Sequence, residues 1–571
     1  MHIDVVPNRK SHPTILLREA WREGHRICKK TLANLTDWPQ EKVEALRRIL
    51  AGDKLVSPSE FLRIERSTPH GHVELIVGMI RKIGLESVLA SRRSRERDLV
   101  IGMIVERLIE PVSKLGTTRL WQTSTLPEEL GLGEADVNEL YAALDWLLAG
   151  QDRIEKKLAA RHLHEGSRAL YDVSSSFYYG RHCALAQFGH DRDKKGLPII
   201  VYGMLTDDVG RPVAVQTYRG NTADPTTVSD QVLKLRERFG LSAVVLVGDR
   251  GMLTQTQIQT LKDYPGIGWI SCLRSEAIRK LMSEGNLQRS LFDRVHLAEI
   301  SSPIYPGERL VACFNPLLSD ERRRKREELL AATEQDLDKI VRAVGRRTRT
   351  PMNAAEIGIR VGRVLHRRKM GKHFSITVAD GSLQWERRND QITKESELDG
   401  LYVIRTSEPP ERLAAEDAVR HYKDLAQVER VFRCAKGDLR LRPIFHRNSD
   451  RVRAHIFLCM LAYYVEWHLR RELAPLLFHD EELSTNRRHR DPVAPAAPSA
   501  SALQKKSSRS TADGLPVQSF RSLLAHMATR CRNTCRLSND PQSPPLVQIT
   551  EPSDLQRRAF ELTGLFPVSQ H

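Results

Sequence analysis

Apolar residues recur along the chain with two different periods. Between residues 72 and 165 they follow the three- to four-residue spacing of amphipathic helices, as in DLVIGMIVERLI and VNELYAALDWLL. From Ser167 the spacing changes to two, which predicts strands in RALYDVSSSFYY, HCALAQFG, LPIIVYGMLTD and RPVAVQTYRG. The change in period separates a helical region from the region that follows it.

The strands after residue 166 are followed by alternating helices and strands. Antiparallel-type strands precede a helix over 225–239, the apolar run SAVVLVGD over 242–249, a helix over 254–263 and the strand GWISCLR. The run AVVLV does not alternate with polar residues, which indicates a strand buried on both faces. This order predicts an α/β fold with a mixed sheet.

A helix is predicted over 411–437, ending in the stretch HYKDLAQVERVFRCAKG. That stretch contains no proline, and its only glycine is the last residue. Leu425, Val428 and Phe432 have the spacing of a buried helical stripe.

Three polar residues lie beside this stripe. Tyr422, Glu429 and Lys436 are seven residues apart, so they fall on nearly one line along the helix. A carboxylate, a phenol and an ammonium are therefore expected at the edge of a core, where they can reach a substrate. A solvated helix edge has the same pattern, so the helix alone does not establish a site.

The remaining patterns divide the chain into seven regions. The stretch APAAPSASALQKKSSRS has the composition of a disordered linker. The regions are a small hairpin and helix region at 1–70, a helical region expected to bind DNA at 71–165, the first part of an α/β core at 166–274, an insertion domain at 275–400, the C-terminal helices of the core at 401–480, a disordered linker at 481–514 and a C-terminal tail region at 515–571.

The charge balance favours a polyanionic partner. Lys and Arg exceed Asp and Glu by 89 − 72 = 17, which is typical of nucleic-acid-binding proteins and also of some basic soluble proteins. Arginines cluster in SRRSRERD at 91–98, where they could contact phosphates or form a solvated charged face. No apolar run approaches the roughly 18–20 residues of a membrane span, so we expect a cytoplasmic protein without a membrane partner.

One acid lies inside a predicted strand, and another lies at the end of one. Asp172 lies just before Ser174, and Asp249 closes the AVVLV run. Sites form at the carboxyl ends of strands in such sheets, although an acid there can also cap a turn. With Glu429 they give three carboxylates, which are stable together mainly with divalent cations between them. Hard oxygen ligands favour Mg²⁺ or Mn²⁺, and two such ions suit in-line phosphoryl displacement.

Several motifs, in order, resemble the DDE transposases of bacterial insertion sequences, in the group with a Y-R-E-K signature. The resemblance covers roughly residues 10–475. Leu425 stands where the signature has arginine, and we predict that it continues the apolar stripe. The motifs are YDVSSSFYYG, GHDRDKKGLPIIVYGMLTD, YRGNTADPTTV, VLVGDRGM, DGLYVIRT and Tyr422-x2-Leu425-x3-Glu429-x6-Lys436.

The resemblance implies an RNase H-like mixed sheet at 166–274 and 401–480, with a strand-rich insertion domain at 275–400 and a mainly helical DNA-binding region before it. It implies that Asp172, Asp249 and Glu429 are catalytic and hold two Mg²⁺ ions, with Mn²⁺ as an alternative. Tyr422 and Lys436 are then expected to bind the DNA backbone near the scissile phosphate.

The activity that the resemblance implies is cut-and-paste transposition. Water attacks first and liberates a 3′-OH, which then attacks target DNA. The expected partners are double-stranded DNA, as terminal inverted repeats and target, and further copies of the chain on the DNA ends. The expected location is the bacterial cytoplasm, with the nucleoid.

Two alternatives stay open at this point. The first is a catalytically inactive DNA-binding remnant of a transposase, which would be expected to have lost an acid, whereas all three are present. The second is a metal-dependent endonuclease without strand transfer, which shares the first reaction step.

Overall fold

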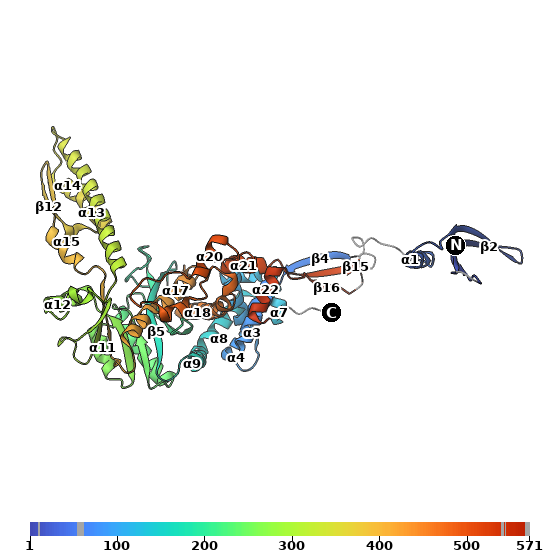
Figure 1. Ribbon diagram of the computed structural model, residues 1–571, viewed down its shortest axis with the longest axis horizontal. Helices are drawn as coiled ribbons and strands as arrows, with labels where there is room; N and C mark the ends of the chain where they lie inside the picture. Colours follow the sequence, from blue (N-terminus) through green and yellow to red (C-terminus); the bar gives the residue numbers. More distant parts are fainter. Residues whose placement is uncertain (10–11, 54–61, 538–541, 543, 566–571) are drawn as a thin grey trace. The chain divides into compact units, whose positions relative to one another are not determined.

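The computed structural model describes residues 1–9, 12–53, 62–537, 542 and 544–565. The chain divides into two compact units (Figure 1). One contains Met1–Thr68 and Cys531–Thr550, and the other contains Pro69–Arg530 and Glu551–Ser569. In the described part of the chain, no helix combines the length and the apolar character needed to cross a membrane.

The described residues of the first unit form two three-stranded sheets and helix α1. The predicted hairpin is confirmed, with its turn at Gly24, whose φ of 59° favours glycine. The helix expected in this region is also present, as α1. The elements are β1 (His2–Val6), β2 (Thr14–Glu23), β3 (Arg26–Asn34) and α1 (Gln40–Leu50), and β4 (Leu62–Pro69), β15 (Cys531–Leu537) and β16 (Leu546–Ile549).

The second unit begins with the predicted helical region. Its central helix, α5, is buried from Arg97 to Leu108 and packs against α8 and α18. Asp136 starts α8 with a capping box that it shares with Glu139. The helices are α3 (Gly71–Lys82), α4 (Leu85–Leu89), α5 (Arg95–Ile109), α6 (Lys114–Leu120), α7 (Leu126–Leu130), α8 (Val137–Ala149) and α9 (Gln151–His162), with α18 (Ser449–Glu472) later in the chain.

An eight-stranded mixed sheet forms the centre of this unit, as the α/β pattern predicted. The pairs β5–β8 and β8–β9 are parallel, and the other pairs are antiparallel. Helices α17 (Leu425–Lys436) and α18 pack on it (Figure 1). In spatial order the strands are β10 (Leu297–Ile300), β11 (Arg309–Phe314), β14 (Leu401–Thr406), β9 (Ile267–Cys272), β8 (Val244–Val247), β5 (Ser167–Phe177), β6 (Ile199–Asp207) and β7 (Pro212–Arg219).

One local prediction in this region was wrong. HCALAQFG is not a strand, because it makes a single bridge, from Gln187 to Ile199, before the chain turns away. The helix predicted at 225–239 is confirmed, as three consecutive helical segments: η2 (Asp224–Thr227), α10 (Val228–Leu233) and the π-helical turn η3 (Lys234–Arg238). The helix predicted at 254–263 is present as α11 (Gln255–Lys262).

The segment predicted as an insertion domain, 275–400, has two parts. Strands β10 and β11, which follow α12 (Ser275–Ser283), belong to the central sheet because β11 pairs with β14. The residues after Pro316 have a separate hydrophobic core, which leads us to propose that the insertion proper is about 316–396. Its elements are α13 (Pro316–Gly345), α14 (Ala354–Arg368), β12 (Phe374–Ala379), β13 (Ser382–Arg387) and α15 (Asn389–Ser396).

The linker predicted as disordered, 481–514, is folded and contains α19 (Leu483–His489) and α20 (Ala500–Ser508). Val493 is 1% exposed, and its carbonyl accepts hydrogen bonds from Asn315 at 3.0 Å and Lys423 at 3.1 Å. The prediction failed because side chains of the core bind the backbone of this segment, which its composition does not reveal. The C-terminal tail region contains helices α21 (Phe520–Met527) and α22 (Asp554–Thr563).

The single helix predicted at 411–437 is two helices, α16 (Ala415–Lys423) and α17. The break is at Asp424, which is 5% exposed and is bound through both carboxylate oxygens by Arg487 of α19, at 2.5 and 2.6 Å. The predicted stripe of Leu425, Val428 and Phe432 is buried.

Replacing Leu425 with alanine is expected to destabilise the protein by about 2–5 kcal/mol, because a buried leucine is lost and a cavity is left behind. Urea unfolding followed by fluorescence measures the change. Leu503→Ala is the matched control, since Leu503 is 52% exposed in α20. Equal effects of the two substitutions would mean that Leu425 does not act through burial.

Candidate active site

The two strand acids are brought together by the parallel pair β5–β8. The register pairs Leu170 with Val247. Asp172 and Asp249 each come two residues after this pair in the direction of the strands. The two acids therefore lie at about the same height along the sheet. Successive residues of a strand point to opposite faces, which puts Asp172 and Ser174 on one face of β5.

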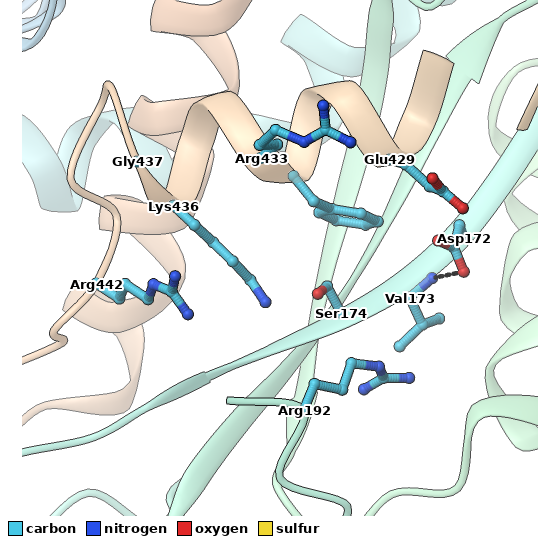
Figure 2. Close-up of a pocket in the computed structure, with 10 residues that line it drawn as sticks. Asp172, Val173, Ser174, Arg192, Glu429, Arg433, Lys436, Gly437 and Arg442 are labelled. Atoms are coloured by element: carbon cyan, nitrogen blue, oxygen red, sulfur yellow. Dashed lines mark hydrogen bonds between the residues drawn. The ribbon is translucent and has the colours of Figure 1, made fainter. Parts of the chain in front are cut away.

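Helix α17 lies across β5 and supplies the third acid. Phe432 anchors the helix, because it is buried and meets Tyr202 of β6 edge to face at 5.7 Å. Glu429 is three residues before Phe432, and it lines a cavity of about 460 Å³ together with Asp172. Figure 2 shows the two carboxylates at the same end of this cavity.

The charges of all three acids act on one another. Burial raises the pKa of Asp172 to about 7, and the negative charges of Asp249 and Glu429 act in the same direction. The hydrogen bond from the Val173 N–H, at 2.8 Å, and the positive charge of Arg192 oppose this rise. Burial and the two neighbouring acids therefore disfavour the charged form of Asp172.

Asp249 has a local structural role as well. Its Oδ1 accepts hydrogen bonds from the N–H groups of Gly251 and Met252, both at 2.8 Å. This is the turn-capping role that the sequence left open. It uses one carboxylate oxygen, so capping does not exclude a second role for the other oxygen.

The donor set fits a divalent cation. The three acids offer hard oxygen ligands, and a nearby cation would reverse the electrostatic penalty that raises the pKa of Asp172. A compact metal site would bring one ligand atom of each acid within 4.8 Å of the others. Among the residues that the structure describes, Asp172, Asp249 and Glu429 do not meet this distance. The acids are thus more widely spaced than the ligands of one compact site.

The trio that does meet this distance is Cys434, Asp438 and Glu466. Arg470 already occupies the cation position there, because it donates to Glu466 at 2.5 Å and to Asp438 at 3.1 Å. Cys434 donates its thiol proton to Glu466 at 3.0 Å. This trio therefore joins α17 to α18 as a polar contact.

Four cationic side chains also line the cavity, and two of them, Lys436 and Arg442, lie at the end away from the carboxylates. Lys436, Arg192, Arg433 and Arg442 all line the cavity, and Figure 2 shows Lys436 and Arg442 pointing toward its interior from one side. Sequence analysis found Lys436 but not the arginines. The signal for Arg192 was its place in the motif GHDRDKKG, whereas nothing in the sequence singled out Arg442.

The cavity cations are only partly neutralised. Lys436 Nζ lies 3.8 Å from Asp193 Oδ1, which also pairs with Arg442. Burial lowers the pKa of Lys436 to about 8, with Arg442 and Arg192 acting in the same direction and Asp193 against it. Arg192 pairs with Asp224 at 2.5 Å, yet among the residues that the structure describes its buried Nη1 has no hydrogen-bond partner. The cationic part of the cavity therefore suits an anionic ligand.

Tyr422, the remaining predicted site residue, is on α16 and packs against the core. It does not line the cavity described above. Burial raises the pKa of its phenol well above the usual range, and Cys272 and Asp249 act in the same direction. Tyr422 is therefore a neutral hydroxyl on the Asp249 side of the acids.

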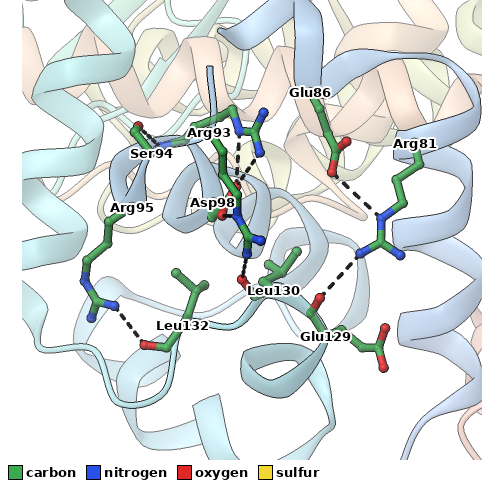
Figure 3. Close-up of polar contacts among 10 residues, drawn as sticks. Arg81, Glu86, Arg93, Ser94, Arg95, Asp98, Glu129, Leu130 and Leu132 are labelled. Carbon is green, nitrogen blue, oxygen red and sulfur yellow. Dashed lines mark hydrogen bonds and ion pairs between the residues drawn. The ribbon is translucent and has the colours of Figure 1, made fainter. Parts of the chain in front are cut away.

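The arginine cluster at 91–98 makes contacts within the chain (Figure 3). Arg93 donates to Asp98 at 2.6 Å and to the Leu130 carbonyl at 2.5 Å. Arg95 donates to the Leu132 carbonyl at 2.8 Å and to Glu139 at 2.6 Å. These contacts hold the helices together, so phosphate docking by this cluster stays a prediction without support from its geometry.

Comparison with known proteins identifies the family. A family described as "Transposase DDE domain" matches residues 174–465, just over half of the 571-residue chain. Asp249, Glu429 and Lys436 lie inside the match, and Asp172 lies two residues before it. None of the curated proteins matches the chain. Enzymes of this family cut or transpose DNA, and they generally use divalent metal ions. The chain therefore belongs to the DDE transposases, and its mixed sheet is the RNase H-like fold of that family.

Proposed function

We propose that this protein is the cut-and-paste transposase of a bacterial insertion sequence, of the Y-R-E-K group, acting on the terminal inverted repeats of its own element. The observation that carries the proposal is the cavity, in which Asp172 and Glu429 face a group of cationic side chains. Carboxylates suit metal ions and cations suit phosphates, so one cavity provides for both parts of a phosphoryl-transfer reaction.

Asp172, Asp249 and Glu429 would hold the metal, as two Mg²⁺ ions or two Mn²⁺ ions. In such sites the ions activate the attacking oxygen and stabilise the leaving oxygen of an in-line displacement. The wide spacing of the three acids supports ions shared between pairs of acids over a single ion held by all three.

Lys436 would bind a phosphate oxygen next to the scissile bond. Its ammonium is mostly protonated at neutral pH, because its pKa is lowered only to about 8. Its carboxylate partner, Asp193, is 3.8 Å away, so a phosphate oxygen at hydrogen-bond distance would be a closer partner. Tyr422 would donate its neutral hydroxyl to the backbone on the Asp249 side.

The reaction has two steps, a hydrolysis and a transesterification. Water attacks the phosphorus at the element end, the P–O3′ bond breaks, and the products are a 3′-OH and a 5′-phosphate. The free 3′-OH then attacks a phosphorus of the target strand and displaces another 3′ oxygen. Both steps use the same acids, because both are in-line displacements at phosphorus. Joining two element ends requires at least two copies of the chain on the DNA.

The decisive experiment is a strand-transfer assay. The substrates are duplexes that carry the inverted repeats flanking the gene, either intact or already cut to expose the 3′-OH, with a supercoiled plasmid as target. We expect Mg²⁺-dependent cleavage of the intact ends and joining of the precut ends, and loss of both products with EDTA.

Each alternative predicts a different result in this assay. A metal-dependent endonuclease would cleave the intact ends but would not join the precut ends to the plasmid. An inactive remnant would bind the ends and do neither. Short inverted repeats bounded by direct duplications in the flanking DNA would support the insertion-sequence origin.

A further inference from the structure

Two large aromatic side chains are exposed near the cavity and stack on each other. Tyr179 is 55% exposed and Phe445 is 63% exposed. Their ring centroids are 6.0 Å apart, and the ring planes are inclined by 29°. We refer to Tyr179 and Phe445 together as the aromatic pair.

The backbone fixes the aromatic pair. Tyr179 follows β5 and Phe445 follows α17, and Tyr178 forms a parallel bridge with Ile444. The Tyr179 N–H donates to the Ile444 carbonyl at 3.0 Å. Because the two backbone segments that carry the rings are hydrogen-bonded to each other, the fold itself holds the rings side by side.

A series of contacts connects the aromatic pair to the cavity. Tyr179 meets Phe177 edge to face at 5.3 Å. The guanidinium of Arg442 lies 5.8 Å from the centre of the Phe177 ring, and Arg442 also lines the cavity. The pair is therefore one side chain removed from a cavity residue.

The stretches of chain on which the two rings lie are basic. The segments 177–190 and 439–449, which carry the two rings, contain no Asp or Glu. Arg181 and Arg447 each lie two residues after a ring of the pair, and both are exposed. Exposed rings beside unbalanced positive charge are the combination that binds single-stranded nucleic acid, through base stacking and phosphate attraction together.

We propose that the aromatic pair is a stacking platform for an unpaired nucleobase of the DNA strand whose phosphate occupies the cavity. This rests on the proposed function, since it takes the cavity ligand to be DNA. Releasing a base from a duplex stack costs free energy. Stacking on the aromatic pair would offset that cost next to the scissile phosphate, and it would hold the strand without reading its sequence.

A pair of probes separates base stacking from phosphate binding. One is a fluorescein-labelled oligothymidylate of about twelve nucleotides, which is within the range of known single-strand sites. The other has the same length and number of phosphates but abasic sugars throughout. Fluorescence anisotropy with the full-length protein should show tighter binding of the oligothymidylate. In Tyr179→Ala/Phe445→Ala this affinity should fall on the order of tenfold, with binding of the abasic strand unchanged.

Three further variants control the interpretation. Tyr179→Leu/Phe445→Leu keeps apolar side chains without rings and should lose the same affinity as the alanine pair. Tyr179→Phe/Phe445→Tyr keeps both rings and should bind as the wild type does. Phe478→Ala removes a ring that is 55% exposed elsewhere and should have no effect.

The outcomes decide between the proposal and its rivals. Equal affinity of the wild type for the two probes would overturn it, as would an equal loss of abasic binding in the alanine pair. A smaller mass of the free alanine variant in light scattering would show that the pair contacts a second copy, and this would also overturn it. Absence of cleavage and strand transfer by the wild type would refute the proposed function while leaving the difference between the two probes intact.

Discussion

Glu429→Gln is expected to abolish both DNA cleavage and strand transfer. The substitution keeps the size and hydrogen bonding of the side chain but removes one charge from the proposed metal ligands. Metal ions contribute several kcal/mol to transition-state stabilisation in such sites, so a loss of about a thousandfold or more in rate is expected. The measurement is the initial rate of nicking at an inverted-repeat duplex with Mg²⁺ supplied.

DNA binding by Glu429→Gln should stay the same or become tighter, because a negative charge that would face phosphate is gone. Lys436→Ala should do the opposite, weakening binding at the scissile end and leaving the acids in place. Glu416→Gln is the matched control, since Glu416 is exposed in the adjacent helix α16, and it should cleave normally. Wild-type cleavage by Glu429→Gln would remove α17 from the active site.

Local patterns were sufficient to predict the parts of the fold that carry the acids. The AVVLV run predicted a strand because no polar residue interrupts it, and β8 is that strand. Leu425, Val428 and Phe432 predicted a buried helical face, and α17 buries all three. In both cases the information lies within a few residues of the element itself.

What the sequence could not predict depends on residues that are distant along the chain. The break between α16 and α17 lies at Asp424, which Arg487 binds, and no local signal at Asp424 indicates it. The linker prediction failed for the same reason, since Lys423 and Asn315 bind its carbonyls. Strand β15 pairs with β4 from the other end of the chain, and propensity does not report such pairings.

The residues of the candidate site also differ in whether the sequence could predict them. Asp172 and Glu429 were identifiable because they belong to motifs and to periodic elements. Arg192 and Arg442 lie outside regular elements, in the chain before β6 and after α17, and only the folded structure brings them to the cavity. Loop residues that join a site in this way have no periodicity from which they could be predicted.

Replacing Lys234 with methionine is expected to destabilise the protein by about 3–5 kcal/mol, because it leaves a buried carboxylate without its partner. Lys234 donates to Glu155 at 3.0 Å, and the two side chains are only 3% and 0% exposed. Their contact joins α9 to the chain after α10. Without Lys234, the carboxylate of Glu155 stays buried with Arg238 as its nearest cation, at 3.9 Å.

Thermal and urea unfolding measure the effect, and an exposed ion pair provides the control. Arg324 and Glu328 are also 3.0 Å apart, but they are 69% and 60% exposed. Arg324→Met should therefore cost less than about 1 kcal/mol, because water already solvates both charges. If Lys234→Met and Arg324→Met lower the free energy of unfolding by similar amounts, burial does not decide the effect.

A double variant separates the buried charge from lost packing. Glu155 also accepts the Val215 N–H at 3.0 Å and the Gln151 amide at 2.7 Å, so its oxygen has to be kept. Glu155→Gln retains that oxygen and removes the charge. Adding it to Lys234→Met should restore much of the lost stability, since no unpaired ion is then buried. If the double variant is instead as unstable as the sum of the two single variants, the loss comes from packing around Lys234, and the buried carboxylate is not its cause.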